Sequence, residues 1–475
     1  MTIKRANAAA TALLAVATGA GLAPSAGAEV FRPDVFELDN GLTVVVVTNR
    51  TAPVVSHMLW YKVGAADEEP GVSGIAHFLE HLMFRGTETV PDGEFSRIVQ
   101  REGARSNAMT SWDYTAYFQN VASDRLGRMM ELEADRMANL AITDEVVAPE
   151  RNVILEERGQ VVESRPSSRL NEQMYATLFQ NHPYGIPIIG WRHEIEDLSI
   201  NDARAFYDRW YAPNNAVLVL AGDIDVEAAR PLVEETYGRI PARDVPERTR
   251  LEEPDSGAEF SVTLTSDQVQ LPNWRRFYLA PTYTDDPNGH AYALQVLDEL
   301  LGTGTTSRLY RSLVVEQEIA VAAGTSYRPA GVDQGPLVAY MTPRGDTGMA
   351  ALEEAFEAEI ERLLTEGLTE EEVATAKDRL TISSTFARDS LMAPVYAFGQ
   401  ALATGGTIDD VERWPSRIDA ISADDVMAAA EAVFGANGRH VTGYLLPEDP
   451  DAAIRLDEPV DPDAVSPDMD TEIVQ

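Results

Sequence analysis

The sequence predicts an α+β fold built from two similar halves, and two observations support this prediction. Strand-like and amphipathic helical segments follow one another in the same order twice, and a polar, proline-bearing stretch at residues 240–257 separates the two series. The length of 475 residues and the 44% content of hydrophobic residues are typical of a globular chain with two to four domains. We therefore expect an N-terminal half at residues 29–245 and a C-terminal half at residues 246–446.

The first half opens with a strand-like segment at residues 35–48, which turns at Asn40 and Gly41, a pair that favours a tight turn between strands. Several amphipathic helices follow, and the apolar run at residues 216–221 predicts a buried strand. The second half begins with another strand-like segment, at residues 260–265. The second half thus begins with the same kind of element as the first half.

The first 28 residues have the composition of a secretory signal peptide. Lys4 and Arg5 precede an apolar stretch at residues 8–23, and residues 26–28 form an A-x-A cleavage site. The stretch is too short and too rich in Gly, Ala and Thr to span a membrane, and no later segment offers 18 uninterrupted apolar residues. We expect an exported protein, most simply in a bacterial periplasm.

Charge and cysteine content narrow the choice of partner and chemistry. A net charge of −39 argues against binding to the phosphate backbone of nucleic acids. The absence of cysteine excludes disulfides and thiolate metal ligands. Between Glu448 and Glu472 lie ten acidic residues, one arginine and several prolines, so we expect a disordered or extended tail at residues 447–475.

Residues 77–81, with the sequence HFLEH, carry the strongest chemical signal of the chain. On a helix, His77 and His81 lie on one face and can bind one metal ion, while Glu80 lies beside them as a general base. H-x-x-E-H is the reverse of the commoner H-E-x-x-H and is the signature of the inverzincins. The motif therefore predicts a zinc hydrolase.

A catalytic zinc ion needs a third protein ligand and an open position for water. A later helical segment offers three acids for this role. Glu150 and Glu157 lie two turns apart on one face of that helix, whereas Glu156 is rotated away by about 100°. We therefore expect the zinc ligands to be His77, His81 and Glu157.

These motifs resemble those of the M16, or pitrilysin-type, metallopeptidases, in which H-x-x-E-H is followed at a distance by E-x6-E and the last Glu binds zinc. The likeness covers roughly residues 35–445. Its further matches are residues 74–76, 82–87, 106–111, 183–185 and 210–221.

The resemblance implies two similar α+β halves, each a mixed or antiparallel β-sheet packed with helices, the first catalytic and the second completing a chamber wall. It also implies hydrolysis of peptides or short unfolded segments by a zinc-activated water, with Glu80 as the base. Glu150 would support the zinc ligands from behind, the alternative being an exposed acid in the first turn of a helix. Asn107 and Ala108 would lie on an edge strand that binds an extended peptide by strand addition.

The second half lacks the metal motif. When residues 294–305 are aligned with residues 76–87, the apolar positions match. The positions of the two ligands and the base are occupied by Gln295, Asp298 and Glu299. We therefore expect no zinc in this half.

One departure from the resemblance bears on function. Family members that act as a single chain or as identical subunits carry an Arg and a Tyr seven residues apart in the second half, which hold the substrate and stabilise the developing oxyanion. Here Val314 and Val321 stand at those positions. The nearby side chains that could replace the pair are Arg308, Tyr310, Arg311 and Tyr327.

The missing pair leads us to expect a heterodimer with a similar but zinc-less subunit that carries the Arg and the Tyr, as in the mitochondrial processing peptidases. The alternative is a non-catalytic scaffold or assembly subunit, like some relatives in respiratory complexes. Such relatives usually lose part of H-x-x-E-H or the distal Glu, and this chain keeps all of them.

Overall fold

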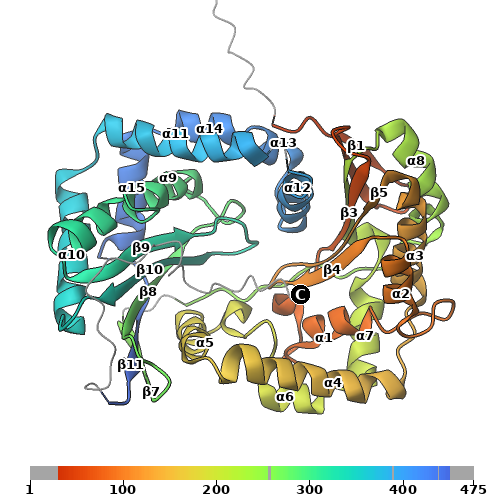
Figure 1. Ribbon diagram of the computed structural model, residues 1–475, viewed down its shortest axis with the longest axis horizontal. Helices are drawn as coiled ribbons and strands as arrows, with labels where there is room; N and C mark the ends of the chain where they lie inside the picture. The colour runs from red at the N-terminus through yellow and green to blue at the C-terminus, as the bar shows by residue number, and fades with distance from the viewer. Residues whose placement is uncertain (1–29, 255–257, 388–389, 437, 450–475) are drawn as a thin grey trace, which may run out of the picture.

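The computed structural model describes residues 30–449, apart from 255–257, 388–389 and 437. Two β-sheets covered by helices lie at opposite ends of the molecule, which confirms the α+β prediction (Figure 1). None of the helices in the described part of the chain is long and apolar enough to cross a membrane. The expected signal peptide and nearly all of the expected acidic tail lie outside the described residues.

The first sheet has six strands in the order β1-β2-β6-β3-β5-β4. Strands β2 and β6 are parallel and all other neighbours are antiparallel, so the sheet is mixed. The predicted turn between β1 and β2 is present, and Gly41 adopts a positive φ of 85° there. The strands are β1 (Asp34–Glu37), β2 (Thr43–Thr48), β3 (Val54–Tyr61), β4 (Arg105–Thr110), β5 (Thr115–Ala122) and β6 (Ala216–Gly222).

The second sheet has five strands in the order β7-β11-β8-β10-β9, and it repeats the first. In both sheets the first long strand of the half pairs in parallel with the last strand, and one edge is formed by β4 in the first sheet and by β9 in the second. The predicted repetition of one plan is therefore confirmed. The strands are β7 (Phe260–Ser266), β8 (Asn273–Ala280), β9 (Ala320–Tyr327), β10 (Gly335–Pro343) and β11 (His440–Pro447).

Helices pack against both faces of each sheet. In β3, Leu59 and Tyr61 face the main core of the first half, and the alternate residues Met58 and Trp60 face a separate apolar cluster. The helices of the first half are α1 (Ile75–Leu82), α2 (Glu94–Arg101), α3 (Leu126–Asn139), α4 (Asp144–Arg158), α5 (Pro166–Leu178), α6 (Arg192–Asp197), α7 (Ile200–Trp210) and α8 (Val226–Glu235). Those of the second half are α9 (Ala291–Leu301), α10 (Met349–Glu366), α11 (Glu370–Ala387), α12 (Ala393–Ala403), α13 (Ile408–Glu412), α14 (Trp414–Ala420) and α15 (Ala423–Phe434).

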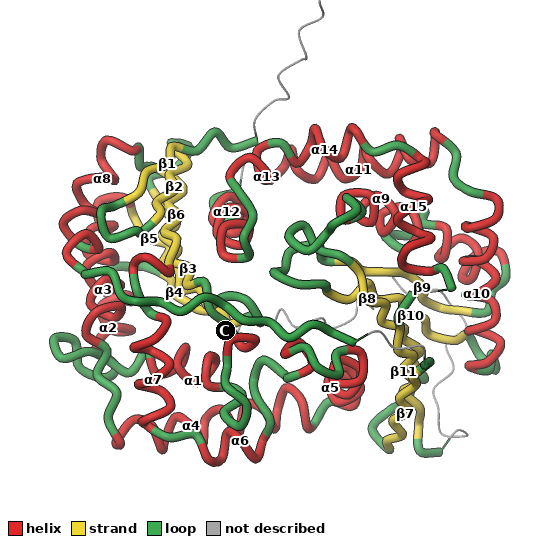
Figure 2. Tube along the Cα trace, turned by 180° about the vertical axis from the view of Figure 1, so that it is seen from behind, coloured by secondary structure: helices red, strands yellow, loops and turns green. Residues whose placement is uncertain are grey.

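One helix of each half packs against the sheet of the other half. Helix α12 belongs to the second half by sequence, but its Val395 and Phe398 pack with Trp60 of the first sheet. Helix α5 belongs to the first half, and its Leu170 and Met174 pack against the second sheet. Figures 1 and 2 show α12 beside β3 and α5 beside β11 from opposite sides. We refer to α5 and α12 as the exchanged helices, and they join the halves through apolar packing.

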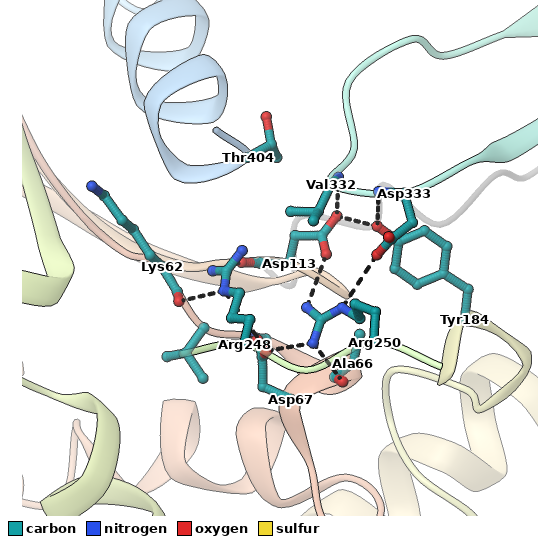
Figure 3. A network of polar contacts seen from close by, with 12 residues as sticks. Lys62, Ala66, Asp67, Asp113, Tyr184, Arg248, Arg250, Val332, Asp333 and Thr404 are labelled. Atoms are coloured by element: carbon teal, nitrogen blue, oxygen red, sulfur yellow. Dashed lines mark hydrogen bonds and ion pairs between the residues drawn. The ribbon is translucent and has the colours of Figure 1, made fainter. Parts of the chain in front are cut away.

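A buried polar network joins the halves as well (Figure 3). Arg250, in the segment that connects the halves, forms an ion pair with Asp67 at 2.6 Å and a longer one with Asp113 at 3.4 Å. Its Nε lies 3.3 Å from a carboxylate oxygen of Asp333, in the loop between β9 and β10. Nearby, Arg248 donates a hydrogen bond to the backbone carbonyl of Asp113. One connecting segment thus contacts both halves through charged groups.

Candidate metal centre

Helix α1 carries the H-x-x-E-H motif, and its first turn is held by an acid that precedes it. The backbone N–H groups of Gly74 and Ala76 donate to the two oxygens of Glu68, at 2.9 and 2.8 Å. Gly74 has a φ of 85°, and a side chain there would meet the backbone oxygen of Ile189 at 2.5 Å. Glycine is therefore required at this position. These contacts fix the start of α1 against the rest of the first half.

The structure brings His77, His81 and Glu157 together. Nε2 of His77 lies 3.8 Å from Oε1 of Glu157, and Nε2 of His81 lies 3.5 Å from Oε2 of the same carboxylate. Within the described residues this is the only group of three His, Asp or Glu side chains close enough to share a metal ion. The two histidines come from successive turns of α1, and Glu157 comes from α4, which packs against it.

The cluster has the dimensions and chemistry of a zinc site. Tetrahedral zinc with bonds of about 2.0–2.1 Å separates its ligand atoms by about 3.4 Å, close to the distances found here. Oε2 of Glu157 is buried and accepts no hydrogen bond in the described chain. Such an oxygen is costly to bury unless a cation lies beside it. Two imidazoles and one carboxylate are also a donor set of catalytic zinc. The residues present therefore fit the ion.

Glu150 supports this cluster through His81. Its Oε1 lies 2.8 Å from Nδ1 of His81, and its other oxygen is bound by Arg85. A proton on Nδ1 leaves the lone pair of Nε2 directed toward Glu157, the orientation a metal ligand needs. Glu150 is only 2% exposed and lies well inside α4, so the alternative of an exposed acid in the first turn is wrong. Glu156, by contrast, is exposed.

Burial and mutual contacts shift the pKa values of the three ligands. Burial, followed by the neighbouring His81, lowers the pKa of His77 to about 4. Burial alone would lower the pKa of His81, but its hydrogen bond with Glu150 and the neighbouring carboxylate of Glu157 raise it to about 9. Burial would raise the pKa of Glu157, yet the 3.5 Å contact with His81 and the charges of both histidines hold it below its usual value. A proton on His81 thus takes the place of a cation.

Glu80 lies beside these ligands and has the properties of a general base. It is 5% exposed, and burial raises its pKa to about 7, opposed by a hydrogen bond from Thr110 and by His81. A base with a pKa near neutrality is suited to accepting and then donating a proton. The hydroxyl of Thr110 donates to Oε2 of Glu80 at 2.5 Å.

The predicted peptide-binding residues lie on the strand that ends at Thr110. Asn107 and Ala108 are central residues of β4, which forms one edge of the first sheet. Ala108 is buried, and Asn107 is partly exposed. The same strand therefore carries both the expected edge for a peptide and a contact to the base.

The positions in the second half that correspond to the ligands are used for packing. Gln295 accepts a hydrogen bond from the indole of Trp414, and Glu299 faces Arg379 at 3.9 Å. Asp298 is buried, and burial raises its pKa to about 6. In the described part of this half, no group of His, Asp and Glu side chains meets the geometry of a metal site.

Val314 and Val321 are both buried in the second half. Val314 lies in the π-helical turn Tyr310–Glu316 and is 1% exposed, and Val321 lies in β9 with no exposed surface. Their side chains are apolar and enclosed, so neither can donate to a substrate.

Three of the four alternative donors near them are bonded or buried, whereas Arg311 is exposed and lies 3.7 Å from Glu316. Arg308 bonds to the carboxylate of Glu372 at 2.7 Å. The hydroxyl of Tyr327 donates to the backbone carbonyl of Pro281 at 2.5 Å. Tyr310 is buried in the core of the second half.

The sequence did not point to Glu68, Arg85 or Thr110. Glu68 and Arg85 flank the motif helix, but Glu68 lies six residues before the N-cap Gly74, outside the positions at which an N-cap residue is recognised. Thr110 has no local signal either, because its contact with Glu80 spans 30 residues and depends on the packing of α1 against β4.

Comparison with known proteins gives a consistent result. A family model described as insulinase, peptidase family M16, matches residues 43–191, and one described as the peptidase M16 inactive domain matches residues 197–380. The zinc protease PqqE of Helicobacter pylori is 34% identical over 291 residues, which span 60% of this chain and 64% of that protein. The uncharacterized zinc protease YmxG of Bacillus subtilis is 26% identical over 404 residues, 84% of this chain and 95% of that one.

Solved structures agree with this assignment. The crystal structure of a protease from Helicobacter pylori is similar with a TM-score of 0.82 and 26% identity, covering 88% of this chain and all of that one. The first half of the protease PqqL from Escherichia coli has the same fold, with a TM-score of 0.75 at 20% identity, over 90% of this chain and 95% of that one. The two family models, the relatives and the shared fold agree with the motif and its geometry. The chain therefore belongs to the M16, or pitrilysin-type, peptidase family.

Proposed function

We propose that this protein is an exported zinc-dependent endopeptidase that hydrolyses peptides or short unfolded segments, as the catalytic subunit of a heterodimer. The observation that carries the proposal is the meeting of His77, His81 and Glu157 beside the buried base Glu80. The names of the relatives as zinc proteases support the same chemistry.

The site residues of the chain have three different roles in such a reaction. His77, His81 and Glu157 would hold zinc, which supplies a water of lowered pKa and polarises the scissile carbonyl. Glu80 accepts the proton of that water and passes it to the leaving amine, because its pKa of about 7 allows both steps near neutral pH. Glu150 keeps His81 in the required tautomer through the 2.8 Å contact to Nδ1.

The edge strand β4 supports an extended peptide as substrate. Addition of a strand along Asn107 and Ala108 would hold the substrate through main-chain hydrogen bonds, which are tolerant of sequence. A folded protein offers few unpaired extended segments. We therefore infer that the substrates are peptides or unfolded segments.

A partner subunit is proposed because the chain offers no second-half donor at the expected places. Val314 and Val321 are buried and apolar, while Arg308 and Tyr327 are engaged within their own half. Without a donor aimed at the oxyanion, a hydrolase of this type loses about 10² to 10³ in rate. A zinc-less subunit that carries an Arg and a Tyr would supply the missing donors.

The partner proposal predicts a difference between two preparations. The chain purified alone is expected to bind zinc and to cleave peptides slowly. Co-expression with a zinc-less family member should raise the rate by about the factor given for an oxyanion donor. Full activity of the isolated chain would contradict the division of labour and point back to Arg308, Tyr310 or Tyr327.

Export is proposed from the first 28 residues alone. Secretion with removal of the peptide after Ala28 should give a mature protein that begins at Glu29. Sequencing of the N-terminus of protein recovered from the periplasm of the producing cell tests this. An intact N-terminus on protein retained in the cytoplasm would contradict it.

The metal assignment is tested by a matched pair of substitutions in α4. Glu157→Gln should lose zinc and peptide hydrolysis together, because the third ligand is gone. The neighbouring Glu156 is exposed, so Glu156→Gln should retain both. Zinc per chain is measured by elemental analysis. A Glu157→Gln protein with full zinc content, or a Glu156→Gln protein without zinc, would show that the ligand set is wrong.

A further inference from the structure

We propose that Thr110 is a positioning residue that holds Glu80 in the orientation of a general base, an inference that rests on the proposed function. The hydroxyl of Thr110 donates to Oε2 of Glu80 at 2.5 Å. Within the described residues, no other group donates to this carboxylate. One oxygen is therefore held by the protein, and Oε1 remains for a water molecule.

The place of Thr110 in the sheet makes it a rigid donor. It is the last residue of β4 and pairs with Thr115 of β5, whose own hydroxyl donates to the backbone carbonyl of Val63 at 3.0 Å. The next residue, Ser111, donates its backbone N–H to Tyr114 and closes the turn. A hydroxyl on such a fixed backbone can set the rotation of a carboxylate.

The second half contains the same contact without the catalytic chemistry. Asp298 takes the place of Glu80 on α9, and Thr325 of the edge strand β9 donates to its Oδ1 at 2.6 Å. A threonine on an edge strand thus bonds to an acid on the covering helix in both halves. This hydrogen bond between strand and helix therefore forms even in the half that lacks the metal motif.

The two contacts differ in what they leave unbonded. In the second half, the backbone N–H of Tyr327 donates to the other oxygen of Asp298 at 3.2 Å, so both oxygens are bound to β9. In the first half, only one oxygen of Glu80 is bound to β4. The second-half carboxylate is fully used in joining helix to strand, whereas Glu80 keeps one oxygen for proton transfer. The Thr110–Glu80 hydrogen bond can therefore affect catalysis, whereas the Thr325–Asp298 hydrogen bond affects only the structure.

The pair provides a test with an internal control. Thr110→Val removes the hydroxyl at nearly constant shape, Thr110→Ser keeps it, and Thr325→Val removes the corresponding hydroxyl in the second half. Each variant is assayed in the form, alone or with the partner subunit, in which the wild type hydrolyses a peptide. We measure kcat, KM, zinc per chain and the melting temperature of each.

Thr110→Val should lower kcat by about 10- to 100-fold, the range typical of a lost supporting contact, with KM and zinc content unchanged. Thr110→Ser should restore most of the rate. Thr325→Val should lower the melting temperature and leave kcat at the wild-type value. If Thr110→Val fails to fold, Thr110→Cys, a weak donor, should give a kcat between those of wild type and Glu80→Gln.

Two results would overturn the inference while leaving the proposed function intact. One is a folded, zinc-loaded Thr110→Val enzyme with the kcat of the wild type. The other is an equal loss of kcat in Thr110→Val and Thr325→Val, since the bond would then act only through stability. If the wild type hydrolysed the peptide no faster than Glu80→Gln, the proposed function would be contradicted. The inference about Thr110 would then also be wrong.

Discussion

His81 is held by two carboxylates at once. Its Nδ1 lies 2.8 Å from Glu150 and its Nε2 lies 3.5 Å from Glu157. Although burial acts in the opposite direction, these contacts raise the pKa of His81 to about 9. The imidazole of the metal-free protein is thus cationic at neutral pH, and the proton on Nε2 stands where a metal would bind.

Zinc binding at about pH 7.5 should therefore release at least about one proton per ion, because the metal must displace the proton of His81 and also lowers the pKa of its bound water. Isothermal titration calorimetry in two buffers with different ionisation enthalpies measures this number. Glu150→Gln removes a contact that raises the pKa, so it should release a smaller fraction of a proton. Zinc binding without proton release in the wild type would contradict the arrangement.

The same shift predicts how the stability of the metal-free protein depends on pH. The folded pKa of about 9 exceeds the usual histidine pKa of 6.5, so the stabilisation from His81 is complete below pH 6.5 and is lost as the pH rises through 9. Above about pH 8, His77 and Glu80 have nearly completed their own titrations. The melting temperature should fall between about pH 8 and 9, and His81→Gln should flatten this slope. A flat wild-type profile would contradict it.

Local spacing in the sequence was enough to select the members of the cluster within each helix. His77 and His81 are four apart, and Glu150 and Glu157 are seven apart, so a helix places each pair on one face. Thr110 could not be found in this way, because its contact depends on how a strand packs against a helix. Spacing within one element carries that information, whereas packing between elements does not.

At the scale of elements, the exchanged helices explain how the two halves form one body. Phe398 of α12 has no exposed surface and packs in one cluster with Trp60 and Val217 of the first sheet. Sequence periodicity predicted apolar strands and amphipathic helices correctly, but it assigned each helix to the half in which it lies. The apolar face of a helix does not specify which sheet covers it.

Phe398→Ala should lower the free energy of unfolding by about 3–5 kcal/mol, the cost of removing a buried aromatic side chain. Because its contacts lie on the first sheet, amide exchange should accelerate in β3 and β6 even though the substitution is in the second half. Ile382→Ala on α11 is a suitable control, since that side chain is 57% exposed. It should change stability by no more than about 0.5 kcal/mol. Equal effects of the two variants would show that α12 does not stabilise the first sheet.

At the scale of the whole molecule, the segment around Arg250 couples the halves electrostatically. Its guanidinium meets Asp67 and Asp113 of the first half and Asp333 of the second (Figure 3). The side chains of Asp67 and Asp113 are at most 5% exposed, and Arg250 is the nearest cation to both, with Arg248 a further 3.7 Å contact of Asp67. Sequence composition indicated only a polar connecting stretch here, because the partners of Arg250 are distant in the chain.

Arg250→Ala should destabilise the protein by about 3–5 kcal/mol, because it leaves buried carboxylates without their cation. Arg209→Ala is the matched control, since Arg209 pairs with Glu69 on the surface, where both side chains are at least 47% exposed. A surface pair contributes about 0–1 kcal/mol. Denaturant titrations of both variants measure the difference. A loss for Arg250→Ala as small as that of the control would show that the network does not couple the halves.

The proposed function makes Glu80 a buried base beside the three residues that would hold zinc. The decisive measurement compares the zinc content and peptide hydrolysis of Glu80→Gln with those of the control Glu156→Gln, in the assembly in which the wild type is active. Glu80 is not a ligand, so zinc content should equal that of the wild type, while hydrolysis should fall by about 10² or more, as expected for loss of a general base. The exposed control should keep both properties. Undiminished hydrolysis by a zinc-loaded Glu80→Gln protein would contradict the account.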